Sequence, residues 1–230
     1  MIELVVLDMA GTTVGEHGIV YRALEDSVTD AGASVNATDL QTWMGADKTE
    51  AIAALLELGG VKADPELVAR QFDYFRALLA ERYAGNPPVA LPGVEDALRT
   101  LKARGIKVGL STGFSRDVAA PILETLGWGI GQGQLLDAVV TSDEVAAGRP
   151  APYMIHRVME ATGVHNVRNV VAGGDTMVDL LAANNAGVNG LGVLTGALGR
   201  EELEQYPHSW VLDGVKDLPS VLESALVNQQ

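Results

Sequence analysis

Carboxylates, hydroxyls and an arginine follow short apolar runs at four places along the 230-residue sequence. The four segments are Asp8–Thr13, Ser111–Gly113, Ser142–Pro150 and Gly173–Asp179. Carboxylate oxygens are the ligands that a hard cation such as Mg²⁺ prefers. Once phosphoryl oxygens are neutralised, a carboxylate can also attack phosphorus. The residue types therefore predict a metal-dependent site for a small phosphate or phosphonate.

Three aspartates in these segments are the predicted nucleophile and metal ligands. Asp8 and Asp175 supply carboxylate oxygens, and Asp8 is the predicted nucleophile that forms an aspartyl-phosphate. Asp179 lies one helical turn after Asp175 and shares its face, so it can ligate through water or orient the nearer ligands.

The remaining residues of the pattern suit phosphoryl oxygens. Gly11 lets the backbone approach them closely, while Ser111 and Arg149 can hydrogen-bond the oxygens that gain charge. Each residue alone has a simpler explanation, because an Asp after a strand is usually a turn or N-cap residue and an Arg is usually a surface ion-pair partner. The occurrence of all of them, each at a strand end, favours a site.

Short apolar runs alternate with amphipathic helical patterns, which predicts an α/β fold: a Rossmann-like parallel sheet covered by helices. The expected strands are Glu3–Leu7, Lys107–Leu110, Ala138–Thr141, Asn169–Ala172, Gly190–Leu194 and a short one at Trp210–Leu212. Ligands of such sheets bind outside the carboxyl ends of the strands. The four segments should therefore meet at one crevice.

The first two strands are separated by roughly 75 residues that have only helical patterns, too many for a single crossover. We therefore predict a core domain of residues 1–14 and 90–230 with an inserted helical cap domain of residues 15–89. Its expected hinges are Gly15–Gly18 and Gly85–Pro88. Within the cap, a stripe at helical spacing predicts core packing by Val68, Phe72, Phe75 and Leu79.

The composition limits the class of protein. Hydrophobic residues make up 47% and charged residues 20%, so the chain can bury a substantial core. The formal net charge of −14 argues against nucleic acid or an anionic membrane as a partner. There is no cysteine, which excludes disulfides and zinc–thiolate sites. No apolar stretch is long enough to span a membrane and the N-terminus does not resemble a signal peptide, so we expect a cytoplasmic protein.

The segments Asp8–Thr12, Ser111 and Gly173–Asp179 resemble the signature motifs of the haloacid dehalogenase superfamily, and the helical insert resembles that family's mobile cap. Two positions depart from the common phosphatase pattern. Ala10 stands where most of those phosphatases have a second Asp that acts as acid and base. Arg149 stands where most have a Lys. Both departures resemble the phosphonoacetaldehyde hydrolase branch, which cleaves a carbon–phosphorus bond through a cap lysine that forms a Schiff base.

The segment Met44–Lys48 resembles the stretch of that branch which contains the Schiff-base lysine. Asp47 and Glu50 form a predicted capping box, which places Lys48 at the first position of a helix. An exposed lysine at a helix start is the simpler alternative. Ala51 stands where the branch generally has a His three residues after the lysine, which leaves the exact substrate open.

The resemblance implies a hydrolase that removes the phosphoryl group from a small organophosphonate through an aspartyl-phosphate and a lysine Schiff base, with Mg²⁺ as cofactor. It implies the catalytic residues Asp8, Lys48, Arg149 and Ser111, the substrate-binding residues Gly11, Thr12, Thr112 and Gly113, and the metal residues Asp8, Ala10, Asp175 and Asp179. It also suggests a homodimer. Two alternatives stay open: a phosphomonoester phosphatase of the same superfamily, and a non-catalytic binding module on a decayed hydrolase fold.

Overall fold

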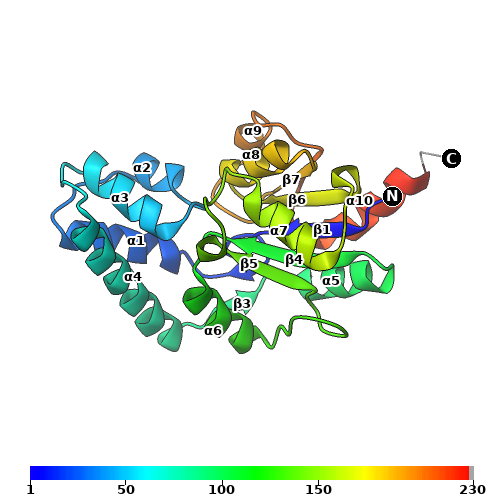
Figure 1. The fold of residues 1–230 in the computed structure, drawn as a ribbon, viewed down its shortest axis with the longest axis horizontal. Coiled ribbons are helices and arrows are strands. Elements are labelled where there is room, and N and C mark those ends of the chain that lie inside the picture. The colour runs from blue at the N-terminus through cyan, green and yellow to red at the C-terminus, as the bar shows by residue number, and fades with distance from the viewer. Residues whose placement is uncertain (228–230) are drawn as a thin grey trace. The chain divides into compact units, whose positions relative to one another are not determined.

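Six strands form a parallel sheet in the order β5-β4-β1-β6-β7-β8 (Figure 1). The computed structural model describes residues 1–227. The strands are β1 Leu4–Leu7, β4 Lys107–Thr112, β5 Ala138–Thr141, β6 Val170–Gly174, β7 Asn189–Val193 and β8 Trp210–Leu212. This confirms the predicted α/β class with a parallel sheet. None of the described helices is long and apolar enough to cross a membrane.

Helices cover both faces of the sheet. They are α5 Val94–Ala103, α6 Arg116–Leu126, α7 Tyr153–Thr162, α8 Met177–Ala186, α9 Arg200–Leu203 and α10 Leu218–Val227. Leu4 and Val6 of β1 pack with Val158 of α7 and Ala183 of α8 in one buried cluster. α5 contacts β4 and α10. All four residues of β1 are buried, which explains why the strand is an unbroken apolar run rather than an alternating one.

The order in which strands are added to the sheet changes sides at β1. The chain runs from β1 outward to β4 and β5 and then returns to β6 on the other side of β1. Because Leu7 is paired with Gly173, the residues that follow β1 and β6 lie side by side. This is the topological switch point at which open parallel sheets bind their ligands.

Two predicted strands end later than expected. β4 continues through Ser111 and Thr112, which pair with Val140 and Thr141 of β5, so these residues belong to the strand and not to the loop after it. β6 continues to Gly174 in the same way, through its pairing with β7. Sheet pairing therefore extends to hydroxyl residues and glycines that the hydrophobic pattern alone excludes.

A two-stranded antiparallel ribbon of β2 (Val14–Gly15) and β3 (Val89–Ala90) marks where the chain leaves the core and returns to it. The chain divides into two compact units, Met1–Gly15 with the chain from Val89 onward, and Glu16–Pro88. Gly15 and Val89 were assigned to the insert from the sequence, but they pair with each other in this ribbon and belong to the core unit.

The inserted unit contains α1 Ile19–Asp30, α2 Ala37–Thr42, α3 Lys48–Leu58 and α4 Pro65–Gly85. α4 begins as expected, with an Asp64 N-cap followed by a proline at its first position. Val68, Phe75 and Leu79 are buried as predicted. Phe72 is only half-buried, and the neighbouring Gln71 is buried in its stead. Gln71 donates a hydrogen bond to Asp30 of α1 at 3.5 Å, so the helix packed against this side decides which residue is covered.

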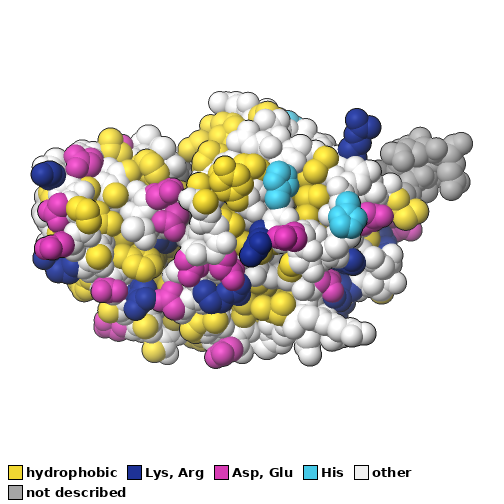
Figure 2. Space-filling model, viewed as in Figure 1, with side chains coloured by type: hydrophobic (Ala, Val, Ile, Leu, Met, Phe, Trp, Pro, Cys, Tyr) yellow, Lys and Arg dark blue, Asp and Glu magenta, His cyan; other side chains and the backbone are white. Residues whose placement is uncertain are grey.

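Surface charge of both signs is scattered over the face in Figure 2, with lysines and arginines interspersed among acidic side chains. Acidic residues outnumber basic ones by 30 to 16 in the sequence. The chain as a whole is therefore negatively charged, and the cations that line a site decide whether a small anion can bind there.

Candidate active site

Asp8 immediately follows β1 and is buried, with 5% of its surface exposed. Its main-chain N–H donates to the carbonyl of Gly173, which continues the sheet pairing by one residue. The chain then turns tightly: the N–H of Val14 donates to the carbonyl of Met9, and the Thr13 hydroxyl donates to the carbonyl of Asp8 at 2.8 Å. These bonds fix the backbone from which the Asp8 carboxylate projects.

Asp8, Asp175 and Asp179 are all buried, and one oxygen of each lies within 4.8 Å of an oxygen of each of the others. Asp175 follows β6, and Asp179 lies in the first turn of α8. Thr176 and Asp179 form a capping box at the start of α8, in which the main-chain N–H and the hydroxyl of Thr176 both donate to Asp179 Oδ2. The sheet end and the helix start thus bring together the three aspartates predicted from the sequence.

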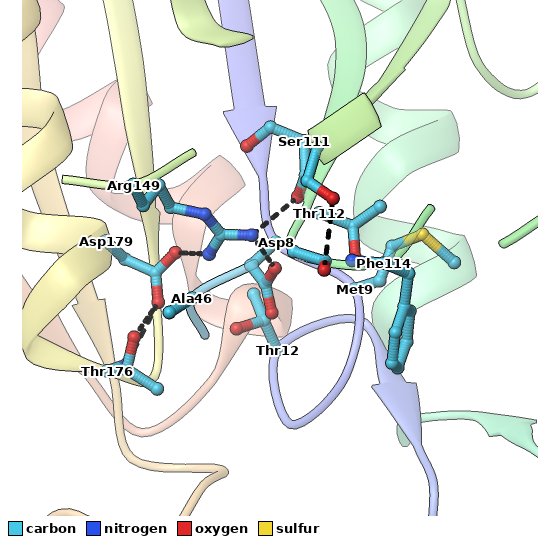
Figure 3. A network of polar contacts seen from close by, with 12 residues as sticks. Asp8, Met9, Thr12, Ala46, Ser111, Thr112, Phe114, Arg149, Thr176 and Asp179 are labelled. Atoms are coloured by element: carbon cyan, nitrogen blue, oxygen red, sulfur yellow. Dashed lines mark hydrogen bonds and ion pairs between the residues drawn. The ribbon is translucent and has the colours of Figure 1, made fainter. Parts of the chain in front are cut away.

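Arg149 lies between Asp8 and Asp179 (Figure 3). Its Nη2 donates to Oδ1 of Asp8 at 2.5 Å and to the main-chain carbonyl of Ser111 at 3.3 Å, while Nη1 donates to Oδ1 of Asp179. Its Nε is buried and has no hydrogen-bond partner among the described residues. A planar guanidinium can bridge two carboxylates in this way because its N–H groups point in fixed, separate directions.

Burial and mutual repulsion shift the pKa values of the charged groups in this cluster. Burial raises the pKa of Asp8 to about 6, against the lowering effect of Arg149, and repulsion by Asp179 adds to the rise. Burial, then repulsion by Asp8 and Asp179, raises the pKa of Asp175 well above its usual value. Burial disfavours the charged form of Arg149, but Asp179 and Asp8 more than compensate and raise its pKa above the ordinary value. Arg149 therefore stays charged.

One buried cation thus faces three buried carboxylates, and a divalent cation would relieve the remaining repulsion. The donor set fits Mg²⁺, which prefers oxygen ligands. Asp179 is already held by Arg149 and Thr176, whereas Arg149 engages only Oδ1 of Asp8. Asp8 and Asp175 are consequently better placed to ligate than Asp179. The predicted ligand Ala10 has no side-chain donor and could contribute only its main-chain carbonyl.

Two of the predicted substrate-binding residues, Gly11 and Thr12, contact Asp175 of this cluster. Gly11 has a φ of 84°, a left-handed conformation that favours glycine. The Thr12 hydroxyl donates to Oδ1 of Asp175 at 2.7 Å, so it is engaged with a carboxylate. The Thr112 hydroxyl accepts the N–H of Phe114, and the carbonyl of Gly113 accepts the hydroxyl of Ser142.

Lys48 lies in the inserted unit, at the first position of α3 as expected. The Asp47 side chain accepts the N–H groups of Thr49 and Glu50, which is the N-cap half of the predicted capping box. Lys48 is only 4% exposed, and its Nζ donates to the carbonyl of Ala46 at 2.9 Å. The simpler alternative of an exposed lysine is therefore wrong. Ala51 is fully buried one turn later.

The sequence analysis missed Thr195 and Gly196, which follow β7. The Thr195 hydroxyl donates to the carbonyl of Gly11 at 2.6 Å, and Gly196 lies directly against Asp175. The rule that ligands bind at strand ends would have included this fifth loop. It was overlooked because it contains no carboxylate or cation.

Known proteins resemble this chain in sequence and in fold. Residues 2–187 match the family model of the haloacid dehalogenase-like hydrolases. The chain is 31% identical over 222 residues to a phosphonoacetaldehyde hydrolase from Bacillus cereus, covering 88% of this chain and 81% of the relative.

Two solved structures share the fold. A phosphonoacetaldehyde hydrolase-like protein from Oleispira antarctica superposes with a TM-score of 0.82 at 25% identity, over 97% of this chain and 92% of the other. A predicted phosphoglycolate phosphatase from Haemophilus somnus superposes with a TM-score of 0.73 at 19% identity, over 96% and 98%. The chain therefore belongs to the haloacid dehalogenase-like hydrolase family, and within that family it resembles the phosphonoacetaldehyde hydrolases.

Proposed function

We propose that this hydrolase cleaves the carbon–phosphorus bond of a small phosphonoaldehyde, such as phosphonoacetaldehyde, with Asp8 as nucleophile and Lys48 as the amine that forms a Schiff base. The observation that carries the proposal is the burial of Lys48 at the start of α3, where its Nζ is held by the carbonyl of Ala46. A buried, fixed amine is a placement that imine chemistry requires and that is rare for lysine. The similarity to the phosphonoacetaldehyde hydrolase of Bacillus cereus supports the same substrate class.

The nucleophile loop also favours this chemistry over ester hydrolysis. A phosphomonoester phosphatase must protonate a departing alkoxide, and Ala10 cannot donate a proton. Loss of a general acid costs about 10²–10⁴-fold in rate. An enamine leaving group needs no proton at that step, so the absence of an acid at position 10 is compatible with C–P cleavage.

The reaction balances with the groups named. Lys48 Nζ adds to the aldehyde carbon and water is lost, which gives a protonated imine. Asp8 attacks phosphorus, and the C–P electron pair moves into the imine to form an enamine and an aspartyl-phosphate. The enamine takes up a proton from water on its carbon, which restores the imine. One water then releases the aldehyde from Lys48 and another releases phosphate from Asp8.

Arg149 and Ser111 have supporting roles in this proposal. The bridge from Arg149 to Asp8 holds the nucleophile in place and presents a positive charge where phosphoryl oxygens would gather. Ser111 is buried at the end of β4, and its hydroxyl can donate to the same oxygens. Asp8, Asp175 and the carbonyl of Ala10 would hold Mg²⁺, with Asp179 as a supporting carboxylate, and the ion would neutralise charge on the phosphoryl group.

Metal removal should abolish activity. After exhaustive treatment with EDTA and desalting, we expect phosphate release to fall to background and to return when Mg²⁺ is added, because Asp8 and Asp175 repel each other and the anionic substrate without a cation. Metal content and phosphate release are measured on the same sample. Full activity in metal-free enzyme would contradict the assignment.

A substrate screen tests the proposed function itself. Phosphate release is measured with phosphonoacetaldehyde and with a panel of small phosphate esters, including phosphoglycolate. We expect phosphonoacetaldehyde to be turned over with a kcat/KM at least about 10²-fold above any ester, in line with the missing general acid. A clear preference for an ester would instead favour the phosphatase, and binding without turnover of any compound would favour a decayed hydrolase.

A further inference from the structure

The loop after β7 is tied to the loop that carries the nucleophile. The Thr195 hydroxyl donates a hydrogen bond to the main-chain carbonyl of Gly11 at 2.6 Å. Gly11 lies three residues after Asp8, in a turn closed by the bond from its own N–H to the carbonyl of Val14. Thr195 therefore connects two strand ends that are far apart in sequence.

Both of the connected loops press a glycine against Asp175. A Cβ built on Gly196 would lie 1.9 Å from Oδ2 of Asp175, and a Cβ built on Gly11 would lie 2.5 Å from the same oxygen. Neither position can carry a methyl group unless the carboxylate moves. Thr12 adds a hydrogen bond to the other oxygen, Oδ1, at 2.7 Å. The carboxylate of Asp175 is thus confined by close contacts at one oxygen and a hydrogen bond at the other.

These contacts hold the Asp175 carboxylate close to two other carboxylates. One oxygen of Asp175 lies within 4.8 Å of an oxygen of Asp8 and of Asp179, and carboxylates at that distance repel one another when they are charged. A rotated Asp175 could no longer share a cation with Asp8. Contacts behind a ligand that fix its orientation typically change metal affinity about 10–100-fold when they are removed.

We propose that Thr195 is a positioning residue of the metal site: its bond to Gly11 keeps Gly11 and Gly196 against Asp175, so that the carboxylate stays where it can ligate Mg²⁺ together with Asp8. This inference rests on the metal site of the proposed function and extends it to a loop without any charged ligand. The hydroxyl acts through the two glycines and does not touch the metal or the substrate.

The test is Mg²⁺ binding measured by isothermal titration calorimetry on metal-free enzyme. Thr195→Val keeps the shape of the side chain and removes the donor, and we expect its Kd for Mg²⁺ to rise about 10–100-fold. Thr195→Ser restores the hydroxyl and should bind close to wild type. The Tm of each variant in EDTA separates a loss of metal affinity from a loss of folding.

A second, independent experiment compares alanine substitutions at two glycines of the loop after β7. Gly196→Ala should weaken Mg²⁺ binding, because its Cβ overlaps the Asp175 carboxylate. Gly199→Ala, in the same loop, meets no atom nearer than 3.4 Å and should bind as wild type. Unchanged Mg²⁺ affinity in Thr195→Val would overturn the inference whatever Gly196→Ala shows, while a wild-type enzyme that binds no Mg²⁺ would overturn the metal site and with it the proposed function.

Discussion

Asp8→Asn should abolish turnover while the fold survives. An amide oxygen can still accept the hydrogen bond from Arg149 that Oδ1 of Asp8 accepts now, and the shape of the side chain is kept. An amide cannot form the aspartyl-phosphate, so we expect kcat to fall by a factor on the order of 10⁶, as when other covalent nucleophiles are removed. Steady-state phosphate release measures the loss.

Two controls make this result decisive. Asp143→Asn changes an exposed carboxylate just after β5 and should retain activity, because Asp143 does not belong to the buried cluster. The intact mass of Asp8→Asn is measured before the assay, since deamidation would regenerate the aspartate. A kcat within about tenfold of wild type would exclude Asp8 from that role, because a missing nucleophile should lower kcat far more than this.

Lys48→Arg should abolish C–P cleavage. Arginine keeps the positive charge at the start of α3 but cannot form an imine, because its guanidinium is not deprotonated in proteins. A C–P bond breaks only if the carbon fragment can accept the electron pair, so we expect no activity above background with phosphonoacetaldehyde. Lys62→Arg, at an exposed position of the same unit, is the matched control and should be fully active.

Borohydride trapping distinguishes imine chemistry from a structural role of Lys48. Borohydride added during turnover reduces the imine to a stable secondary amine. The wild-type enzyme should lose activity and carry a mass increment on the peptide that contains Lys48, whereas neither borohydride nor phosphonoacetaldehyde alone should have this effect. Normal cleavage by Lys48→Arg, or no labelled lysine during turnover, would refute the Schiff base and leave the phosphatase as the better hypothesis.

Strand ends were the most informative part of the sequence. Asp8 and Asp175 are conspicuous because each follows an apolar run, Asp179 lies one helical turn after Asp175, and Arg149 lies in the segment after the third predicted strand. The parallel order of the strands brings these segments together. The same reasoning gave the fold class, which the structure and the family match confirm.

Features that depend on a neighbour were not predictable in this way. Gln71 and Phe72 both lie near the centre of the buried stripe of α4, and only the position of α1 shows that Gln71 is covered. Gly196 contributes through the space that its missing side chain leaves beside Asp175, and that space exists only once the loop after β7 is placed. The burial of Lys48 was likewise invisible to a helix-start pattern, which fits exposed lysines equally well.

The ribbon of β2 and β3 gives the hydrolase a modular architecture. Because Gly15 and Val89 are cross-strand partners, the whole of residues 16–88 is inserted at what would otherwise be a hairpin turn. The core strands, their order and the carboxylate cluster are encoded entirely outside that insertion. The sequences of the insert and of the core can therefore diverge separately in evolution, and a foreign helical insert grafted between the same two residues would leave the chain path of the core unchanged.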